Sequence, residues 1–389
     1  MQKGIGQVIS KSVYYNYILA KQDQDCVISI DRGVNLELRG VKMKALNTFQ
    51  KYFVEEFHED YRQGLINRRE FIRMVAYITG SMAATATTMS LLGCTPDELP
   101  TASEPMPTPR NTATRESPES TSTPTEAEGA ATATSESSSP TAAQLEPVPG
   151  AQSPLSVPEG DPAVRTGEIS LTSQGDKIMA YLARPASGGT SAGLLVCHEN
   201  RGLVAHIKDV ARRFAKEGYV ALAIDLLSRE GGTDSLDREQ IPGLLSNAPA
   251  ERHVGDFAAG LRYLQGLEYV DGERIGMTGY CFGGGITWRC AVALPELKAA
   301  VPFYGPAPDL DQVPNIRAAV FGVYAELDNR ITSGKDALEQ ALQKAEITHQ
   351  MKVYPGVDHA FHNDTGARYK QAQATQAWQD TLAWFEEYL

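Results

Sequence analysis

The chain contains 389 residues with a mass of 42.2 kDa, which is long enough for two domains. Apolar residues make up 42% and charged residues 22%, so wholesale disorder, a collagen-like chain and a coiled-coil rod are excluded. The long uncharged run from Met74 to Pro96 is diluted by Thr, Ser and Gly, which argues against a polytopic membrane protein.

The net charge of −12 is concentrated in one segment. Residues 95–162 carry eleven acidic and two basic side chains, so most of the negative charge lies there. The acidity therefore says nothing about a substrate, and the sequence has no basic cluster that would indicate a nucleic-acid partner. The five cysteines are too scattered for a disulfide scaffold and form no CxxC pair that would predict zinc.

The N-terminal part, residues 1–66, is interpreted as a leader. From Met43 onward, apolar residues recur at the spacing of an amphipathic helix. We hypothesise that Met43 is the true start and that residues 1–42 are not translated, because the next segment has the features of an export signal. The periodic residues are Leu46, Phe49, Phe53, Val54, Phe57 and Tyr61.

Residues 67–94 resemble a twin-arginine export signal that ends in a bacterial lipobox. The motif NRREFIR (Asn67–Arg73) precedes a weakly apolar stretch, and LLGC ends at Cys94, the predicted lipidation site. The resemblance implies export, with the export machinery and the membrane as partners and a lipid anchor at the outer face of the bacterial cytoplasmic membrane or elsewhere in the cell envelope. The alternative is a membrane anchor that is never cleaved.

Residues 95–162 are predicted to be a disordered linker. The segment contains 13 of the 22 prolines and no Phe, Trp or Tyr. A segment of this composition cannot bury enough apolar surface to offset the entropy lost on ordering.

From residue 163 to Leu389, strand and helix patterns alternate, which predicts an α/β domain. The strands read as continuous apolar runs, which is typical of a mostly parallel, doubly wound sheet with helices on both faces. Residues 167–182 predict an antiparallel hairpin that opens the sheet. The expected strands that follow are 192–199, 219–225, 274–280, 299–305, 318–326 and 349–354.

The expected strand 274–280 runs directly into Cys281 within GYCFGGG and then into a helix. This is the pattern of a nucleophile elbow with cysteine in place of serine. The turn is so tight that the residues two positions either side must be nearly without side chains, which accounts for Gly279 and Gly283. The helix N-terminus favours a thiolate. The competing interpretation is a buried structural cysteine.

Two further residues complete a nucleophile, acid and histidine order along the chain. Asp328 follows the expected strand 318–326, and His359 lies in the loop after strand 349–354. His359 is predicted to be the base, with Asp328 fixing its tautomer. The nearby competitors that this order disfavours are His362 for the base and Glu326 and Asp358 for the acid.

Residues 163–389 resemble the dienelactone hydrolases, or carboxymethylenebutenolidases, which have the α/β-hydrolase fold. The motifs that carry the resemblance are HENRGL (198–203), GYCFGGG (279–285), AELDNRI (325–331) and YPGVDHAF (354–361). The resemblance implies a Cys281, Asp328 and His359 triad. It also implies that Glu199 takes the proton of the resting cysteine, and that the backbone N–H groups of Asn200 and Phe282 form the oxyanion hole.

The resemblance is less complete at the substrate. Arg229 matches one of two family arginines that hold a carboxylate, but HAFHND has no arginine at the second position. Arg201 is either a replacement cation or a surface ion-pair residue, and Tyr304 either borders the site or lies in the core. Residues 230–247 are long enough for a lid. No metal and no organic cofactor are implied.

The sequence therefore predicts a hydrolase that cleaves a small activated ester, enol ester or lactone through a cysteine acyl-enzyme. A thiolate is expelled more readily than an amide nitrogen, so peptides are disfavoured. The alternatives are a broad-specificity carboxylesterase and, from a different class, a non-catalytic lipoprotein that binds small ligands. Cys197 and Cys290 are predicted to be free and buried, because their expected positions are too far apart for a disulfide.

Overall fold

The computed structural model describes residues 35–38, 41–44, 46–80, 85 and 145–389, which divide into two compact units. In the first unit, Met1–Leu46, strands β1 (Asn35–Leu38) and β2 (Val41–Lys44) form an antiparallel pair. The second unit is Asn47–Leu389. Cys94 and residues 95–144 of the expected linker lie outside the described residues.

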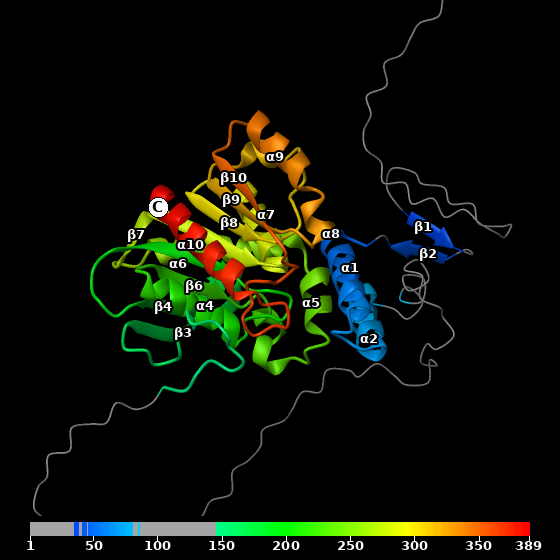
Figure 1. Ribbon diagram of the computed structural model, residues 1–389, viewed down its shortest axis with the longest axis horizontal. Coiled ribbons are helices and arrows are strands. Elements are labelled where there is room, and N and C mark those ends of the chain that lie inside the picture. The colour runs from blue at the N-terminus through cyan, green and yellow to red at the C-terminus, as the bar shows by residue number, and fades with distance from the viewer. Residues whose placement is uncertain (1–34, 39–40, 45, 81–84, 86–144) are drawn as a thin grey trace, which may run out of the picture. The chain divides into compact units, whose positions relative to one another are not determined.

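The second unit is built around an eight-stranded sheet (Figure 1). Its strand order is β10-β9-β8-β7-β5-β6-β4-β3, and all neighbours run parallel except β3 with β4 and β4 with β6. The strands are β3 (Val164–Ser173), β4 (Asp176–Pro185), β5 (Ser191–Cys197), β6 (Val220–Ile224), β7 (Val270–Tyr280), β8 (Ala299–Phe303), β9 (Ala319–Ala325) and β10 (His349–Tyr354). The predicted hairpin and the predicted parallel strands are confirmed, and the fold is of the α/β-hydrolase type.

Helices cover both faces of this sheet. Leu194 of β5 and Phe385 of α10 both lie against Gly276 of β7, so α10 covers one face of the sheet. Leu195, the next residue of β5, points to the opposite face and lies against Gly260 of α6. The helices and 3-10 turns that follow β5 are α4 (Ala205–Lys216), η2 (Ser228–Glu230), η3 (Thr233–Ser235), α5 (Ile241–Asn247), α6 (Ala250–Gln265), α7 (Phe282–Ala293), η4 (Val313–Asn315), α8 (Asn329–Thr332), α9 (Lys335–Lys344) and α10 (Gln371–Tyr388).

Two N-terminal helices, α1 (Thr48–Arg62) and α2 (Arg68–Thr79), belong to the same unit as the sheet. Asn47 and Asn67 each close a capping box with the residue three positions on, which stabilises both helix starts. The amphipathic helix expected in the leader is confirmed, and it begins at Thr48. Residues 67–80, expected within an export signal, form a capped helix whose apolar face packs on α5.

The packed chain around the eight-stranded sheet begins before residue 163, the domain boundary expected from composition. Val148 and Val157 are buried, and Val157 N donates a hydrogen bond to Asp209 of α4 at 2.6 Å. Residues 145–162 are therefore packed chain rather than linker. Proline-rich composition hid this, because the contacts are made by two isolated valines, backbone groups and polar side chains such as Glu159 and Asp161, which give no apolar pattern.

Within the part of the chain that the structure describes, no helix combines the length and the apolar character needed to cross a bilayer. Cys197 and Cys290 are both free and buried, as predicted.

The expected lid, residues 230–247, borders a cavity of about 410 Å³ through Arg238 and Glu239. Its helix α5 contacts α1 and α2, and Leu245 is buried.

Candidate active site

Cys281 occupies a strained turn between β7 and α7. Its φ of 61° is unusual for a residue with a side chain, as a nucleophile elbow requires. A Cβ on Gly279 would lie 2.3 Å from Gly283 O, and one on Gly283 would lie 2.5 Å from His198 O. The two glycines are therefore required by backbone contacts, as the motif predicts.

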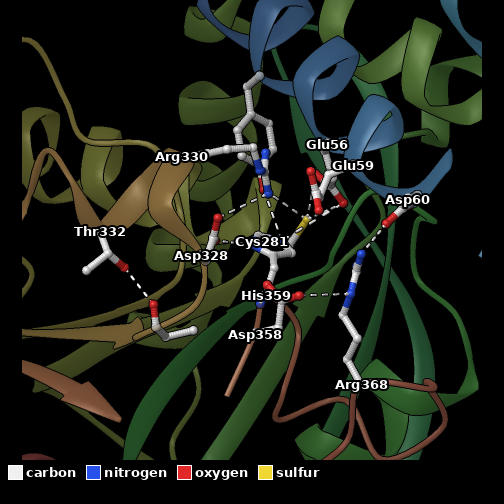
Figure 2. Close-up of polar contacts among 12 residues, drawn as sticks. Glu56, Glu59, Asp60, Cys281, Asp328, Arg330, Thr332, Asp358, His359 and Arg368 are labelled. Carbon is white, nitrogen blue, oxygen red and sulfur yellow. Dashed lines mark hydrogen bonds and ion pairs between the residues drawn. The ribbon is translucent and has the colours of Figure 1, made fainter. Parts of the chain in front are cut away.

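Asp328 and His359 meet beside the elbow (Figure 2). Asp328 follows β9 and His359 follows β10, and their Oδ2 and Nδ1 atoms are 2.6 Å apart. Both side chains are buried. Cys281 Sγ lies within 4.8 Å of a ring nitrogen of His359. The structure thus brings together the three residues that the sequence assigns to the triad.

The competing residues make other contacts. Glu326 Oε2 accepts a hydrogen bond from Gly356 N at 2.7 Å, and Asp358 Oδ1 accepts one from His359 N. The His362 ring stacks on Tyr280 in the core, with ring centroids 5.0 Å apart. These contacts favour His359 as the base and Asp328 as its partner.

Two residues of α1 reach the same reacting atoms, and sequence reasoning missed both. Tyr52 Oη lies 3.2 Å from both Cys281 Sγ and His359 Nε2. Both carboxylate oxygens of Glu56 lie 3.6 Å from Cys281 Sγ, and Figure 2 shows Glu56 close to the cysteine. The available signal was a carboxylate on the apolar face of the predicted helix, one turn after Tyr52.

The charges of the site favour a neutral resting thiol. Burial raises the pKa of Cys281 well above its ordinary value, and the carboxylates of Glu56 and Glu199 raise it further. Burial lowers the pKa of His359, but the adjacent Asp328 and Glu56 carboxylates together outweigh it, so the net pKa is raised. The same ion pair lowers the pKa of Asp328 although burial acts in the opposite direction.

The other predicted site residues surround the elbow at different distances. Among the described contacts, Glu199 does not bond to Cys281. Its Oε2 accepts from Asn363 at 2.5 Å, and its Oε1 is buried without a partner. Phe282 N–H points at the Cys281 sulfur, where it lowers the thiol pKa against the effect of burial. The Asn200 side chain donates to Glu56 Oε1 at 2.7 Å. The Tyr304 ring borders His359 at 4.9 Å between centroids.

The two arginines proposed for substrate binding differ in their surroundings. The guanidinium of Arg229 is held by Asp256 at 2.7 Å and by Asp176 at 2.6 Å. No contact recorded for it involves the triad, so its place is explained by ion pairs and not by the site. Arg201 lies nearer the site, with its guanidinium carbon 5.7 Å from the centre of the Phe57 ring of α1.

The reacting residues also form a set of possible metal ligands. Glu56, Cys281 and His359 each offer one ligand atom, and these atoms lie within 4.8 Å of one another. Carboxylate, thiolate and imidazole are ligands that zinc accepts. The Tyr52 hydroxyl, in contact with both the sulfur and the imidazole, lies among these atoms.

A cavity of about 410 Å³ lies next to the triad rather than over it. Arg201, Asn363 and Arg368 line it from the catalytic side, and Asp60 and Glu70 line it from α1 and α2. Cys281 is not among its lining residues and is only 2% exposed. With α1 in place, the nucleophile has no contact with this cavity.

Comparison with known proteins agrees with this geometry. Residues 178–389 match the profile of the "Dienelactone hydrolase family". A protein of Escherichia coli O157:H7 named "Putative carboxymethylenebutenolidase" is 38% identical over 256 residues, which cover 61% of this chain and 94% of that protein. A protein of the same name from Synechocystis sp. is 31% identical over 242 residues, covering 58% of this chain and 98% of that one.

A solved structure also resembles the catalytic unit. The crystal structure titled "Putative Dienelactone Hydrolase" from Klebsiella pneumoniae superposes with a TM-score of 0.55 at 35% identity. The match covers 58% of this chain and 100% of that chain. Helices α1 and α2 lie outside the residues that the family profile matches.

Proposed function

The chain belongs to the dienelactone hydrolase family and is a hydrolase of ester bonds, and we propose that it cleaves a small activated ester, enol ester or lactone through a cysteine acyl-enzyme. Cys281 is the nucleophile, His359 the base and Asp328 the residue that orients His359. The observation that carries the proposal is the strained Cys281 elbow beside the 2.6 Å contact between Asp328 and His359.

The reaction proceeds in two halves. Cys281 loses its proton to His359 Nε2, and the sulfur attacks the ester carbonyl carbon. The oxyanion that develops is stabilised by the backbone N–H groups of Phe282 and Asn200. Collapse expels the alkoxide, which takes the proton from His359. A water molecule, deprotonated by the same nitrogen, then hydrolyses the thioester and releases the carboxylic acid and the free thiol.

Glu199 is proposed to assist the first proton transfer. Its buried Oε1 has no hydrogen-bond partner, and burial raises its pKa more than the nearby His206 lowers it. A carboxyl group with a raised pKa accepts a proton more readily at neutral pH. Glu199 therefore serves as a temporary acceptor of the Cys281 proton, which it passes on to His359 Nε2 before the leaving group takes it.

The class of substrate follows from the leaving group. A tetrahedral intermediate on sulfur expels whichever group leaves more easily, and an enol or phenol oxygen leaves more easily than an amide nitrogen. Activated esters and lactones are therefore favoured over peptides. The loss of one of the two family arginines and the ion-paired state of Arg229 weaken the case for a carboxylated lactone.

The test is hydrolysis of p-nitrophenyl acetate, an enol lactone and a dienelactone by the full chain and its Cys281→Ala variant. Removal of the nucleophile should lower kcat/KM by at least about 10³-fold. Cys290→Ala, which alters another buried thiol, is the matched control and should retain activity. Equal rates for Cys281→Ala and the control would exclude the cysteine mechanism.

The same panel separates the alternatives. Similar kcat/KM values for simple esters and lactones would favour a broad-specificity carboxylesterase. A well-folded chain that binds panel members without turnover would favour a non-catalytic ligand-binding protein. The buried Asp328–His359 pair argues against the second alternative, since binding alone does not need it.

We also propose that the chain is exported and carries a lipid on Cys94, which places it at the outer face of the cytoplasmic membrane or elsewhere in the cell envelope. The support is the order of the arginine pair, the apolar stretch and LLGC in the sequence. Incorporation of labelled palmitate into the wild type and its loss in Cys94→Ala is the expected result. Labelling that persists in Cys94→Ala would contradict lipidation at this site.

A further inference from the structure

Helix α1 places two side chains where the substrate has to react. Tyr52 Oη contacts both Cys281 Sγ and His359 Nε2 at 3.2 Å, so it stands between the thiol and the base. The Glu56 carboxylate faces the sulfur with both oxygens at 3.6 Å. Its flat carboxylate group resembles an ester in shape, but its negative charge makes its carbon a poor electrophile.

The rest of α1 is fitted to the surface around the nucleophile. The rings of Phe49 and Phe53 pack against Phe282, the residue after Cys281, with centroids 4.8 Å and 5.4 Å apart. The Arg330 guanidinium carbon lies 5.5 Å from the centre of the Tyr52 ring. One turn beyond Glu56, Asp60 accepts a hydrogen bond from Arg368 at 2.7 Å.

The buried acids distinguish this arrangement from simple apolar packing. Burying a carboxylate costs free energy unless it is paired or hydrogen-bonded. Glu56 and Asp60 are both buried, and the catalytic domain supplies a partner to each, Asn200 and Arg368 respectively. An ordinary covering helix would carry apolar residues at these positions, so the two acids indicate specific recognition of the site.

The consequence for catalysis is inhibition. The position in front of the sulfur is occupied, and the Tyr52 hydroxyl lies between Cys281 and His359, where it takes the place of a direct hydrogen bond from the thiol to the imidazole. The Glu56 charge also opposes formation of the thiolate, in addition to the effect of burial on the pKa of Cys281. Occupation of this position and the Glu56 charge lower activity, and they outweigh the hydrogen bond from Tyr52, which by itself lowers the pKa of Cys281.

We propose that α1 is an intramolecular inhibitor that acts as an uncleavable substrate mimic, with Glu56 in the ester position and Tyr52 between nucleophile and base. The proposal rests on the proposed function of Cys281 and adds its regulation. The chain is a latent hydrolase that becomes active when α1 leaves. An export signal is removed by cleavage, and cleavage before Cys94 would separate α1 and α2 from the catalytic part and thereby activate the enzyme.

The experiment compares the full chain with the Tyr52→Ala/Glu56→Ala double variant, with EDTA present so that metal binding plays no part. If α1 has left the site in about 1–10% of wild-type molecules, its release in all molecules raises kcat/KM for p-nitrophenyl acetate about 10- to 100-fold. The rate of Cys281 alkylation by iodoacetamide, followed on its peptide by mass spectrometry, should rise by a similar factor.

The control is Lys51→Ala on the same helix, whose side chain is 71% exposed. It should leave both rates unchanged. Tyr52→Phe and Glu56→Gln keep the shape of the helix and serve if the double variant folds poorly. Each should raise both rates by a smaller factor. Rates equal to those of the control would overturn the proposal. A fall in turnover would also overturn it, because it would indicate that α1 supplies groups that take part in catalysis.

Failure of the inhibitor and failure of the proposed reaction give different results. Faster alkylation of Cys281 in the α1 variants, without hydrolysis of any ester, would support inhibition by α1 and contradict the proposed reaction. Hydrolysis by the wild type, with no increase in the rate of hydrolysis or alkylation in any α1 variant, would support the proposed reaction and contradict inhibition by α1.

Discussion

Cys281 and His359 together set the expected pH dependence. As the base, His359 has to be neutral, so activity rises as the pH passes upward through its pKa. Burial lowers this pKa, but Asp328 and Glu56 together raise it more, so the acid limb of kcat/KM should lie above pH 6.5, the ordinary pKa of histidine. The pH profile of p-nitrophenyl acetate hydrolysis measures this limb directly.

Asp328→Asn should shift the acid limb to lower pH, because it removes the carboxylate that raises the pKa of His359. It should also lower the plateau of kcat/KM by about 10³- to 10⁴-fold, since the correct tautomer is lost. Glu326→Gln, at the competing carboxylate, is the matched control and should keep the wild-type profile. If the acid limb of kcat/KM keeps its position in Asp328→Asn, the limb reports the titration of a group other than His359.

Gly283→Ala should distort the elbow. The added Cβ would meet His198 O at 2.5 Å and Cys197 O at 2.7 Å, and neither backbone atom can move without disturbing β5. We expect a loss of about 1–3 kcal/mol in the free energy of unfolding and a large loss of turnover. Gly188→Ala, where the Cβ has open space, is the comparison for urea denaturation and kinetics.

Residue-level prediction placed Cys281, Asp328 and His359 together correctly because each position is tied to a local motif, and their catalytic roles stay proposals. Cys281, Asp328 and His359 each follow a strand, and parallel strands end at one edge of the sheet. Arg229 also follows a strand, but its ion pairs with Asp256 and Asp176 depend on residues distant in sequence. Its surroundings could not be read from IDLLSRE.

At the scale of elements, continuous apolar runs located the strands of the sheet. The domain boundary expected at residue 163 lies too far toward the C-terminus. Residues 145–162 pack on the domain through isolated contacts, which produce no regular spacing of apolar residues in the sequence. One such contact is the 2.6 Å hydrogen bond from Val157 N to Asp209.

A buried ion-pair network joins α4 to the loop that follows His359. Arg213 of α4 bonds Asp209 and Asp364, and Asp364 lies in the loop that follows His359. Arg213→Met would leave two buried carboxylates without their cation and should reduce the free energy of unfolding by about 3–5 kcal/mol. Urea denaturation measures this, with the exposed Arg262→Met as the control.

The same network has a predicted pH dependence. Burial alone would raise the pKa of Asp364, but hydrogen bonding to His206 and the Arg213 charge lower it below its ordinary value of 3.8. A depressed carboxyl pKa contributes stability above pH 3.8 that is lost as the pH falls below it. Unfolding of the wild type should therefore become easier in this acid range, with a weaker dependence in Arg213→Met.

At the scale of the whole molecule, α1 and α2 pack on each other and both pack on α5. The Tyr77 backbone of α2 lies so close to Gly243 that a Cβ there would be 2.7 Å from Tyr77 O. Gly243→Ala should strengthen α5 itself by up to about 1 kcal/mol, because alanine favours helix. It should nevertheless push α2 away, and turnover and Cys281 alkylation should both increase.

Gly334→Ala is the control for this prediction, because its Cβ would make only an ordinary contact with Ile331 O at 3.7 Å. Both rates should match the wild type in the control. Increased stability of Gly243→Ala without any increase in turnover or alkylation would show that α2 does not restrain α1.

The sequence by itself determined the family, the parallel sheet and the order of nucleophile, acid and base, because these depend on short motifs and on the period of apolar residues. The tertiary structure alone decided that α1 lies over Cys281 and that Glu56 and Tyr52 contact the reacting atoms. The physical reason is separation along the chain. Glu56 and Cys281 are 225 positions apart, and their contact depends on how the helix packs on the finished sheet.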